Sequence, residues 1–306
     1  MPPLRAALPD ALPDALPDAL PDALPGERFE SGGLSCYVAG QGPPLLLVHS
    51  INAAASAAEV RPLYEAYAST RTVFAPDLPG YGHSRREDRL YTPRVMTDAL
   101  HAVAAQVRQR CGAAPLDALA VSLSCEFLAR AAAEQPAHWG RLALVSPTGV
   151  NSRRQRRGAP GSTRALPWLY RLLSNPRWSQ WLFDSLTRPG VVRYFLRKTW
   201  GGPNIDPVMA DHAIRSAREP GARFAPLCFL GGHLFSADIQ TVYEALTQPV
   251  WASHGVRGDF TDYRGLPPLL ARPNWRGTVL DTGALPYFER PAEFIAAFDA
   301  FLGDAG

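Results

Sequence analysis

Short apolar runs alternate with stretches of helical spacing through the first half of the chain. The runs contain few polar residues, as expected for strands buried on both faces of a parallel sheet. The predicted strands span 28–38, 44–49, 72–76, 116–121 and 142–146, and the predicted helices span 57–68, 94–110 and 123–135. This alternation predicts an α/β fold whose parallel strands are joined by right-handed helical crossovers.

The alternation stops near residue 150. The stretch 151–243 holds no clear buried strand and is rich in aromatic and basic residues, which predicts a helical insertion. Further along, strands are predicted at 250–253 and 278–281 and a last helix at 291–302. The predicted architecture is therefore a mostly parallel, doubly wound sheet, with a core at 27–150 and 244–306 and a helical cap at 151–243.

The N-terminal segment has a different texture. Residues 7–25 repeat Ala-Leu-Pro-Asp with a period of four. A proline in every turn removes a helical donor and clashes with the preceding turn, so the repeat cannot form a regular helix. Each repeat offers one leucine for burial. We expect residues 1–26 to form an extended or disordered tail, with docking to a partner as the alternative.

Composition narrows the class of protein. The net charge of +3 is too small to argue for nucleic acid, which requires a concentrated basic face. No run approaches the ~18 apolar residues of a membrane span, and the start does not resemble a signal peptide. We expect a cytoplasmic protein with neither membrane nor nucleic acid as partner, and leave its oligomeric state open. No cofactor is expected, because no glycine-rich phosphate loop follows a predicted strand. No metal is expected, because neither the histidines nor the cysteines are paired at ligand spacing; the cysteines are Cys36, Cys111, Cys125 and Cys228.

A candidate nucleophile lies where the strand at 116–121 gives way to the helix at 123–135. An acyl-transfer serine is held clear of the backbone by a sharp strand–turn–helix, with small residues two places on either side. Around Ser122 those residues are Ala120 and Ser124 in place of the usual glycines. With Ser124 as nucleophile, Glu126 would fall in the crowded position, so we reject that register. Ser122 is the predicted nucleophile, and a helix cap is its alternative role.

Other stretches carry specific motifs in a consistent order. The loop Asp77-Leu-Pro-Gly-Tyr-Gly-His-Ser84 is similar to the Asp-Leu-Pro-Gly-x-Gly-x-Ser loop of the α/β-hydrolase family. The chain resembles that family over nearly all of residues 28–306. The remaining matches are Leu45–His49, Pro136, Leu285–Pro286 and Phe288–Pro291. The resemblance implies an α/β-hydrolase fold with an inserted cap.

The resemblance also implies roles for individual residues. The backbone N–H of Leu123 would be one oxyanion-hole donor, and Ser50 or Ile51 would supply the second, with Ile51 preferred. That loop departs from the family pattern, because Ser50 stands where glycine is usual. Asp259, after the next-to-last strand, resembles the triad acid, and Asp262 is its substitute.

The expected triad is incomplete. The family places its catalytic histidine in a Gly-His-x-Pro context, where this chain has Gly283-Ala284-Leu285-Pro286, and no histidine occurs after His254. His254 ends the next-to-last predicted strand on the active-site edge, so it is the best replacement base. The alternative is that His254 only forms hydrogen bonds to the loop of the acid.

The other histidines are weaker candidates. His49 and His233 are placed with Ser50 at the substrate site, and His49 is also expected to support its own loop. His83 is interpreted as a loop contact. No role is predicted for the three that we place on surface faces or helix ends, His101, His138 and His212.

Two functions compete. The first is a serine hydrolase acting on an ester, thioester or amide with an apolar portion, through an acyl intermediate on Ser122; even without a histidine, water or a carboxylate could support reduced turnover. The second is a catalytically degenerate protein that binds a small apolar ligand. Chemistry of the epoxide hydrolase or haloalkane dehalogenase type is excluded, because Ser122 is not a carboxylate.

The cap carries two further signals. The run at 153–157, Arg-Arg-Gln-Arg-Arg, is interpreted as a solvated turn, with recognition of a carboxylate or phosphate as the alternative. Aromatic and basic residues mix at roughly helical spacing over 167–199, which predicts cap helices that line an apolar pocket. A membrane-surface role is a minor alternative, and its signature would be a cap helix with a continuous unburied apolar face.

Overall fold

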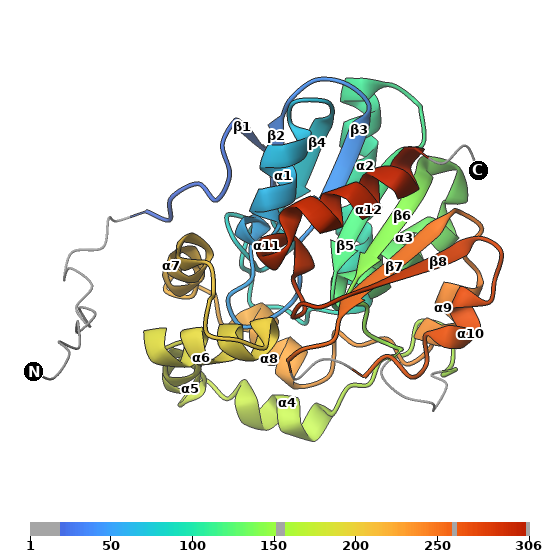
Figure 1. Cartoon of the computed structure of the whole chain (residues 1–306). Coiled ribbons are helices and arrows are strands. Elements are labelled where there is room, and N and C mark those ends of the chain that lie inside the picture. The colour runs from blue at the N-terminus through green and yellow to red at the C-terminus, as the bar shows by residue number, and fades with distance from the viewer. Residues whose placement is uncertain (1–18, 151–156, 259–261, 304–306) are drawn as a thin grey trace, which may run out of the picture.

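The computed structural model describes residues 19–150, 157–258 and 262–303, and its centre is one eight-stranded sheet (Figure 1). The strand order is β1-β2-β4-β3-β5-β6-β7-β8; β2 is antiparallel to both β1 and β4, and all other pairs are parallel. This is the predicted mostly parallel sheet. The strands are β1 (Glu27–Ser31), β2 (Leu34–Ala39), β3 (Pro44–Val48), β4 (Thr72–Pro76), β5 (Leu116–Val121), β6 (Trp139–Val145), β7 (Val250–Gly255) and β8 (Trp275–Leu280).

Helices cover both faces of the sheet (Figure 1). On one face lie α1 (Arg61–Tyr67), α11 (Pro286–Glu289) and α12 (Pro291–Gly303), and on the other α2 (Pro93–Cys111), α3 (Ser124–Glu134), α9 (Ile239–Glu244) and α10 (Pro267–Leu270). Five helices lie in the stretch predicted to be a cap and are called the cap helices below: α4 (Pro167–Leu173), α5 (Ser179–Leu186), α6 (Pro189–Trp200), α7 (Pro207–Ser216) and α8 (Phe224–Leu230). Short 3₁₀ helices occur at η1 (Ala57–Val60) and η2 (Pro136–His138).

Strand β3 shows why the central strands are apolar throughout. Its side chains alternate between the two faces, so Leu46 and Val48 enter one hydrophobic cluster while Leu45 and Leu47 enter the other. Both faces are covered by helices, and all four side chains are fully buried. The continuous apolar run therefore reflects a strand without a solvent face.

The first predicted strand is wrong in one respect. Residues 28–38 form two antiparallel strands, β1 and β2, and not one. The turn between them is Gly32-Gly33, and both glycines have positive φ, 60° and 85°. Such a pair suits a tight hairpin, since glycine adopts this conformation without steric penalty. The glycine pair was the sequence signal for the turn.

The cap helices lie together beyond one edge of the sheet (Figure 1). Helix α6 packs by one face, with Val192, Leu196 and Trp200 buried at intervals of four residues. A mostly buried ion pair joins Arg130 on α3 to Asp238 beside α9. The described part of 157–243 contains no strand, only an isolated bridge between Thr163 and Ser236.

The end of the N-terminal tail packs against the folded chain. Residues 19–26 belong to the segment predicted to be extended or disordered, yet Leu20 and Leu24 are both buried. The backbone of this segment also forms hydrogen bonds, with Ala23 N–H donating to Tyr37 Oη (3.0 Å) and Pro25 carbonyl accepting from Tyr64 Oη (3.0 Å). The prediction for residues 1–18 lies outside the described residues.

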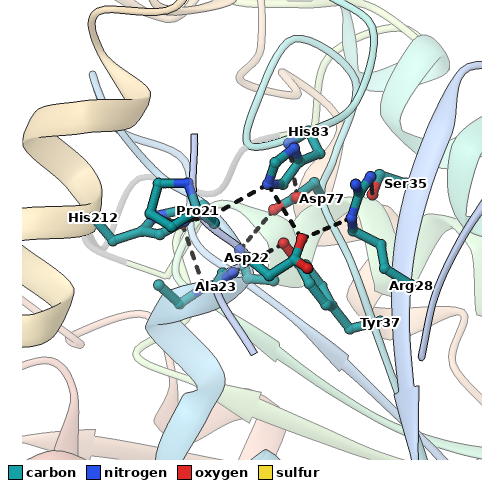
Figure 2. Close-up of polar contacts among 12 residues, drawn as sticks. Pro21, Asp22, Ala23, Arg28, Ser35, Tyr37, Asp77, His83 and His212 are labelled. Atoms are coloured by element: carbon teal, nitrogen blue, oxygen red, sulfur yellow. Dashed lines mark hydrogen bonds and ion pairs between the residues drawn. The ribbon is translucent and has the colours of Figure 1, made fainter. Parts of the chain in front are cut away.

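Pro21 connects this segment to both the core and the cap (Figure 2). Its carbonyl oxygen lies 3.1 Å from Nε2 of His212 on α7 and 3.4 Å from Nε2 of His83 in the core. His212 was predicted to lie on a surface face or helix end, but it is buried. The missed signal was distant in sequence, because the tail covers this histidine.

Candidate active site

Ser122 occupies a sharp turn between β5 and α3. Its φ is +55°, a left-handed conformation that strains any residue with a Cβ. The Ser122 N–H donates to the carbonyl of Val145 on the neighbouring strand (2.8 Å), which holds the turn against the sheet. The Ser122 hydroxyl forms no hydrogen bond with any described residue. Ser122 therefore stands at the strained corner of a strand–turn–helix.

The residues around the turn fix helix α3 to the sheet. The hydroxyl of Ser124 donates to the carbonyl of His49 at the end of β3 (2.5 Å). Cys125 Sγ contacts the carbonyl of Ala120 on β5 (3.2 Å), and both side chains are fully buried. Ser124 therefore has a structural partner, in keeping with its rejection as the nucleophile.

Two backbone donors near Ser122 are free of protein acceptors. The N–H groups of Leu123, just before α3, and of Ile51, after β3, donate to no described residue. In contrast, the N–H of Ser50 donates to the Glu59 carboxylate (2.9 Å). Of the two residues considered for the second oxyanion donor, only Ile51 keeps its N–H available.

Glu59 shapes the loop that carries Ile51. It is buried, and its carboxylate also accepts from the side-chain amide of Asn52 (2.6 Å). The Asn52 side-chain oxygen in turn accepts from the N–H of Ala54 (2.8 Å). This carboxylate takes the place of main-chain hydrogen bonds in an irregular loop. Sequence analysis missed it because Glu59 lies several residues downstream.

His49 is a structural histidine. It is fully buried, and its Nε2 accepts a hydrogen bond from the N–H of Leu78 (2.9 Å). Nε2 must therefore be unprotonated, which leaves Nδ1 as the donor to the carbonyl of Ser50 (2.6 Å). With both nitrogens engaged, His49 joins β3 to the loop that begins at Asp77.

The structure of the Asp77–Ser84 loop shows why its motif needs an aspartate at 77 and a glycine at 82. The Asp77 carboxylate is fully buried and accepts from the N–H groups of Ala57 and His83 (both 2.8 Å). A Cβ at Gly82 would lie 2.0–2.2 Å from that carboxylate, and its φ is +50°. Glycine is required there because the carboxylate fills the space of a side chain.

His254 lies in the same row of the sheet as Ser122, two strands away. The pairing of Val121 with Val145 and of Val145 with Ser253 places Ser122, Ser146 and His254 at successive strand ends. Two strand spacings separate the backbones of Ser122 and His254 by about 10 Å. All seven histidines lie within the described residues, and none forms a hydrogen bond with Ser122.

The surroundings of His254 nevertheless suit a base. Its Nδ1 donates to the carbonyl of Gly255 (3.0 Å), which leaves the Nε2 lone pair available. Burial lowers the pKa of His254, so the neutral form prevails at neutral pH. The ring of Tyr263 stacks on the imidazole at 3.8 Å between centroids, which restricts its movement.

Ala284 is held between the core and the cap. Its N–H donates to the carbonyl of Thr199 on α6 (2.9 Å), and its carbonyl accepts from the Ser146 hydroxyl (2.8 Å). Ser146 ends β6 and is the second non-glycine residue with a positive φ, +50°, in the described chain. The alanine loop is therefore anchored beside the strand end that separates Ser122 from His254.

The predicted acids and basic run are described only in part. Asp259 and residues 153–156 lie outside the described residues. Asp262 forms a close ion pair with its neighbour Arg264 (2.6 Å), which lowers the pKa of the Asp262 carboxyl. Arg157, the last residue of the basic run, pairs with Glu244 (2.5 Å). No hydrogen bond joins Asp262 to a histidine.

His233, assigned to the substrate site, lies in the cap beside α8. It is buried, and burial lowers its pKa. Its ring packs edge-on against Tyr170 with centroids 4.9 Å apart, and its Nε2 is buried without a hydrogen-bond partner.

Glu126 is a buried carboxylate that sequence analysis did not place at the site. It lies in the first turn of α3 and accepts hydrogen bonds from the Thr148 hydroxyl (2.6 Å) and the Ser236 N–H (2.9 Å). It therefore joins the elbow helix to both ends of the cap insertion. A charged residue within an otherwise apolar helix segment was the available signal.

Three further features of the described residues concern metal ligands, membrane spans and hollows away from Ser122. No group of three or more His, Cys, Asp or Glu side chains could hold a metal ion within those residues. None of the described helices is long and apolar enough to cross a membrane. A hollow of about 470 Å³ lies at the opposite edge of the sheet, near Asp117, Trp139 and Gln248, and contains none of the predicted catalytic residues.

These features define the class: the sheet, the strained serine after β5 and the capping helices together form an α/β-hydrolase fold. A sequence model described as the alpha/beta hydrolase fold matches residues 43–186. A search of curated proteins found no match. The family comparison and the structure thus agree on the fold predicted from the sequence.

Solved hydrolase structures share this fold at low sequence identity. A serine hydrolase involved in carbazole degradation, the CarC enzyme, has a TM-score of 0.70 and 16% identity, over 90% of this chain and 97% of that chain. The 2-hydroxy-6-oxo-6-phenylhexa-2,4-dienoate hydrolase from Rhodococcus sp. strain RHA1 has a TM-score of 0.70 and 20% identity, over 90% and 98%. The epoxide hydrolase CorEH has a TM-score of 0.68 and 21% identity, over 90% and 97%.

Proposed function

We propose that the protein is a hydrolase that forms an acyl intermediate on Ser122 from an ester, thioester or amide with an apolar portion. The observation that carries this proposal is the left-handed φ of +55° at Ser122, between a buried strand and a helix. A residue with a Cβ keeps such a conformation only where the surrounding structure enforces it, and such strain is concentrated at functional sites. A serine that only capped a helix would not need it.

The proposed oxyanion hole consists of the N–H groups of Leu123 and Ile51. Neither has a protein acceptor among the described residues, and Leu123 stands at the positive end of α3. In the proposed mechanism the substrate carbonyl accepts from both donors as negative charge develops on its oxygen. Each such donor lowers the barrier by roughly 3–4 kcal/mol.

Proton transfer is the incomplete part of the mechanism. His254 is the proposed base, since its Nε2 is available and its pKa is lowered by burial. Because it is two strands from Ser122 and its ring is stacked on Tyr263, it would act through a bridging water molecule. Asp259 is the proposed acid. Without any base, the oxyanion hole and substrate binding alone would still leave about 10³–10⁴-fold catalysis over water.

One observation favours the second function, binding of a small apolar ligand without turnover. No histidine is hydrogen-bonded to Ser122, and Ala284 occupies the position that the family gives to histidine. In this case Ser122 would be a remnant, and the cap would enclose the ligand. The two functions differ in one property, the reactivity of the Ser122 hydroxyl.

A fluorophosphonate probe tests this difference. The purified protein is treated beside the Ser122→Ala and His254→Ala variants, and the modified residue is located by peptide mass spectrometry. We expect the probe to label Ser122 in the wild type. In the Ser122→Ala variant no peptide should be labelled. Slower labelling of a folded His254→Ala variant would support that histidine as the base. An unlabelled wild type, beside a labelled control hydrolase, would favour the ligand-binding function.

A further inference from the structure

Helices α4, α5 and α6 carry several large aromatic side chains that are not buried. Trp168 on α4 and Trp181 on α5 are 65% and 68% exposed, and Phe195 on α6 is 54% exposed. Leu172 and Tyr194 are also exposed. Large apolar side chains gathered in one region of a soluble protein mark an interaction surface.

The exposed side chains are not the ones by which α5 and α6 pack against the rest of the protein. On α5 and α6 the core-facing positions are already filled, by Phe183 on the former and by Leu196 and Trp200 on the latter. Helix α4, which contains Trp168 and Leu172, has no buried residue at all. Trp168 and Leu172 stay exposed, whereas Tyr170 is partly buried and packs against His233; Figure 1 shows the helix at the outer side of the cap, away from the sheet.

The same segment holds an excess of positive charge. Between residues 157 and 200 the chain has eight Arg or Lys residues and one acidic residue, Asp184, although the net charge of the whole chain is only +3. Several arginine side chains there form no hydrogen bond or ion pair with a described residue. These are Arg164, Arg171, Arg177, Arg188, Arg193 and Arg197.

Aromatic and basic residues are interleaved on this surface. Arg171 lies beside Leu172 on α4, and Arg197 follows Tyr194 and Phe195 on α6. Arginine and aromatic residues are both enriched in protein–protein interfaces, but a protein partner would need acidic residues to match this surplus of arginines. At a bilayer surface, in contrast, aromatic rings lie at the level of the headgroups while arginines contact the phosphates.

We propose that the outer face of α4, α5 and α6 binds the surface of an anionic phospholipid bilayer. The contact is peripheral, since none of the described helices could span the bilayer. It combines shallow insertion of Trp168 and Trp181 with attraction between the unpaired arginines and lipid phosphates. The proposal reverses the expectation of no membrane partner, and it is independent of whether Ser122 is catalytic.

Vesicle co-sedimentation of the full chain tests the proposal. We expect the protein to sediment with vesicles of phosphatidylcholine and phosphatidylglycerol, but not with phosphatidylcholine alone, and to be released by salt. The Arg193→Gln/Arg197→Gln variant should bind on the order of tenfold more weakly, as expected for the loss of two basic residues near a charged surface. The Trp168→Ser/Trp181→Ser variant should also bind more weakly, and should lose the quenching of tryptophan fluorescence by brominated lipid.

Matched variants on the core serve as controls. Arg108→Gln/Arg110→Gln removes the same charge from α2, and Leu90→Ser/Val279→Ser removes exposed apolar side chains outside the cap. Both should bind like the wild type, with circular dichroism confirming that every variant is folded. Binding that is absent, that ignores lipid charge, or that falls equally in core and cap variants would overturn the proposal. So would light scattering that showed this face joining two protein copies in vesicle-free solution.

Discussion

Ser122 and Ser146 hold left-handed backbone conformations at the ends of two neighbouring strands. Each is fixed by its own N–H, which donates to a carbonyl of the next strand, Val145 for the first and Ser253 for the second. These hydrogen bonds offset strain that would otherwise favour glycine. At residue scale, backbone hydrogen bonds therefore fix the positions of Ser122 and Ser146.

Replacement of Ser122 measures the strain directly. The Ser122→Gly variant should be about 1 kcal/mol more stable than Ser122→Ala, because glycine adopts a positive φ without steric penalty. Urea unfolding followed by circular dichroism gives the two free energies. Ser124→Gly and Ser124→Ala, inside α3, form the control pair, for which alanine should be the more stable. An alanine variant at 122 as stable as the glycine variant would contradict the strain.

Ala284 offers the complementary experiment, a gain of function. Ala284→His would place an imidazole where the resemblance implies a catalytic base, and a positioned base typically contributes 10²–10⁴-fold. We expect hydrolysis of an activated ester to rise by at least about 10²-fold, with a rate that increases through the titration of the new histidine. Ala284→Gln controls for size. If Ala284→His/Ser122→Ala were equally fast, the new activity would not pass through Ser122.

At the scale of elements, the segment 19–25 acts as a strap between the core and cap helix α7. Leu20 and Leu24 occupy equivalent positions of successive repeats, and both are buried. The Pro21 carbonyl lies between His212 on α7 and His83 in the core (Figure 2). The His212 ring is also hydrogen-bonded to the hydroxyl of Ser56, the N-cap residue of the 3₁₀ helix η1. One hydrogen-bond network therefore joins the strap, the cap helix α7 and the loop after β3.

Polar substitution of the two leucines should release the strap. Each buried leucine stabilises by ~1.5–3 kcal/mol, so Leu20→Ser/Leu24→Ser should open the strap locally and speed amide hydrogen exchange in α7. Mass spectrometry of exchanged peptides measures this. The same double change at Leu8 and Leu12, in earlier repeats, is the matched control. Equal exchange in α7 for the variant and the wild type would show that the strap does not hold the cap.

At the scale of the whole molecule, the basic residues and the histidines with shifted pKa values are unevenly distributed. The cap segment 157–200 is strongly basic, although the chain as a whole is nearly balanced. Burial lowers the pKa of three histidines, His212 and His233 in the cap and His254 in the core. For His212, the nearby Asp77 and Asp211 act in the opposite direction and His83 in the same one, but burial prevails.

This distribution predicts how stability depends on pH. A histidine whose pKa is lowered by folding binds fewer protons in the folded chain than in the unfolded one. Its stabilising contribution is therefore complete above the unfolded pKa of 6.5 and is lost as the pH falls below that value. The urea concentration at the unfolding midpoint should decrease as the pH is lowered from 7.5 to 5.5. The decrease should be smaller in His212→Gln than in the control His138→Gln. A midpoint that rises on acidification would contradict this.

The sequence by itself determined most of the strands and helices that form the sheet and its covering layers, and the sharp strand-to-helix turn at Ser122. These features depend on short-range properties: apolar runs, helical spacing, small residues beside a turn and glycines such as Gly82 that leave room for a carboxylate. Even the missed hairpin in residues 28–38 had a local signal, the Gly32-Gly33 pair. Such patterns act within a few residues, so they can be recognised without the fold.

Tertiary structure alone decided which distant residues meet. It buried His212 beneath the tail, gave the Ser50 N–H to Glu59, and left His254 two strands from Ser122. It also decided which apolar face of the cap remains exposed, since helical spacing shows that a helix has an apolar face but not what covers it. These outcomes depend on contacts between residues that lie from nine to 191 positions apart, which the spacing of apolar residues does not encode.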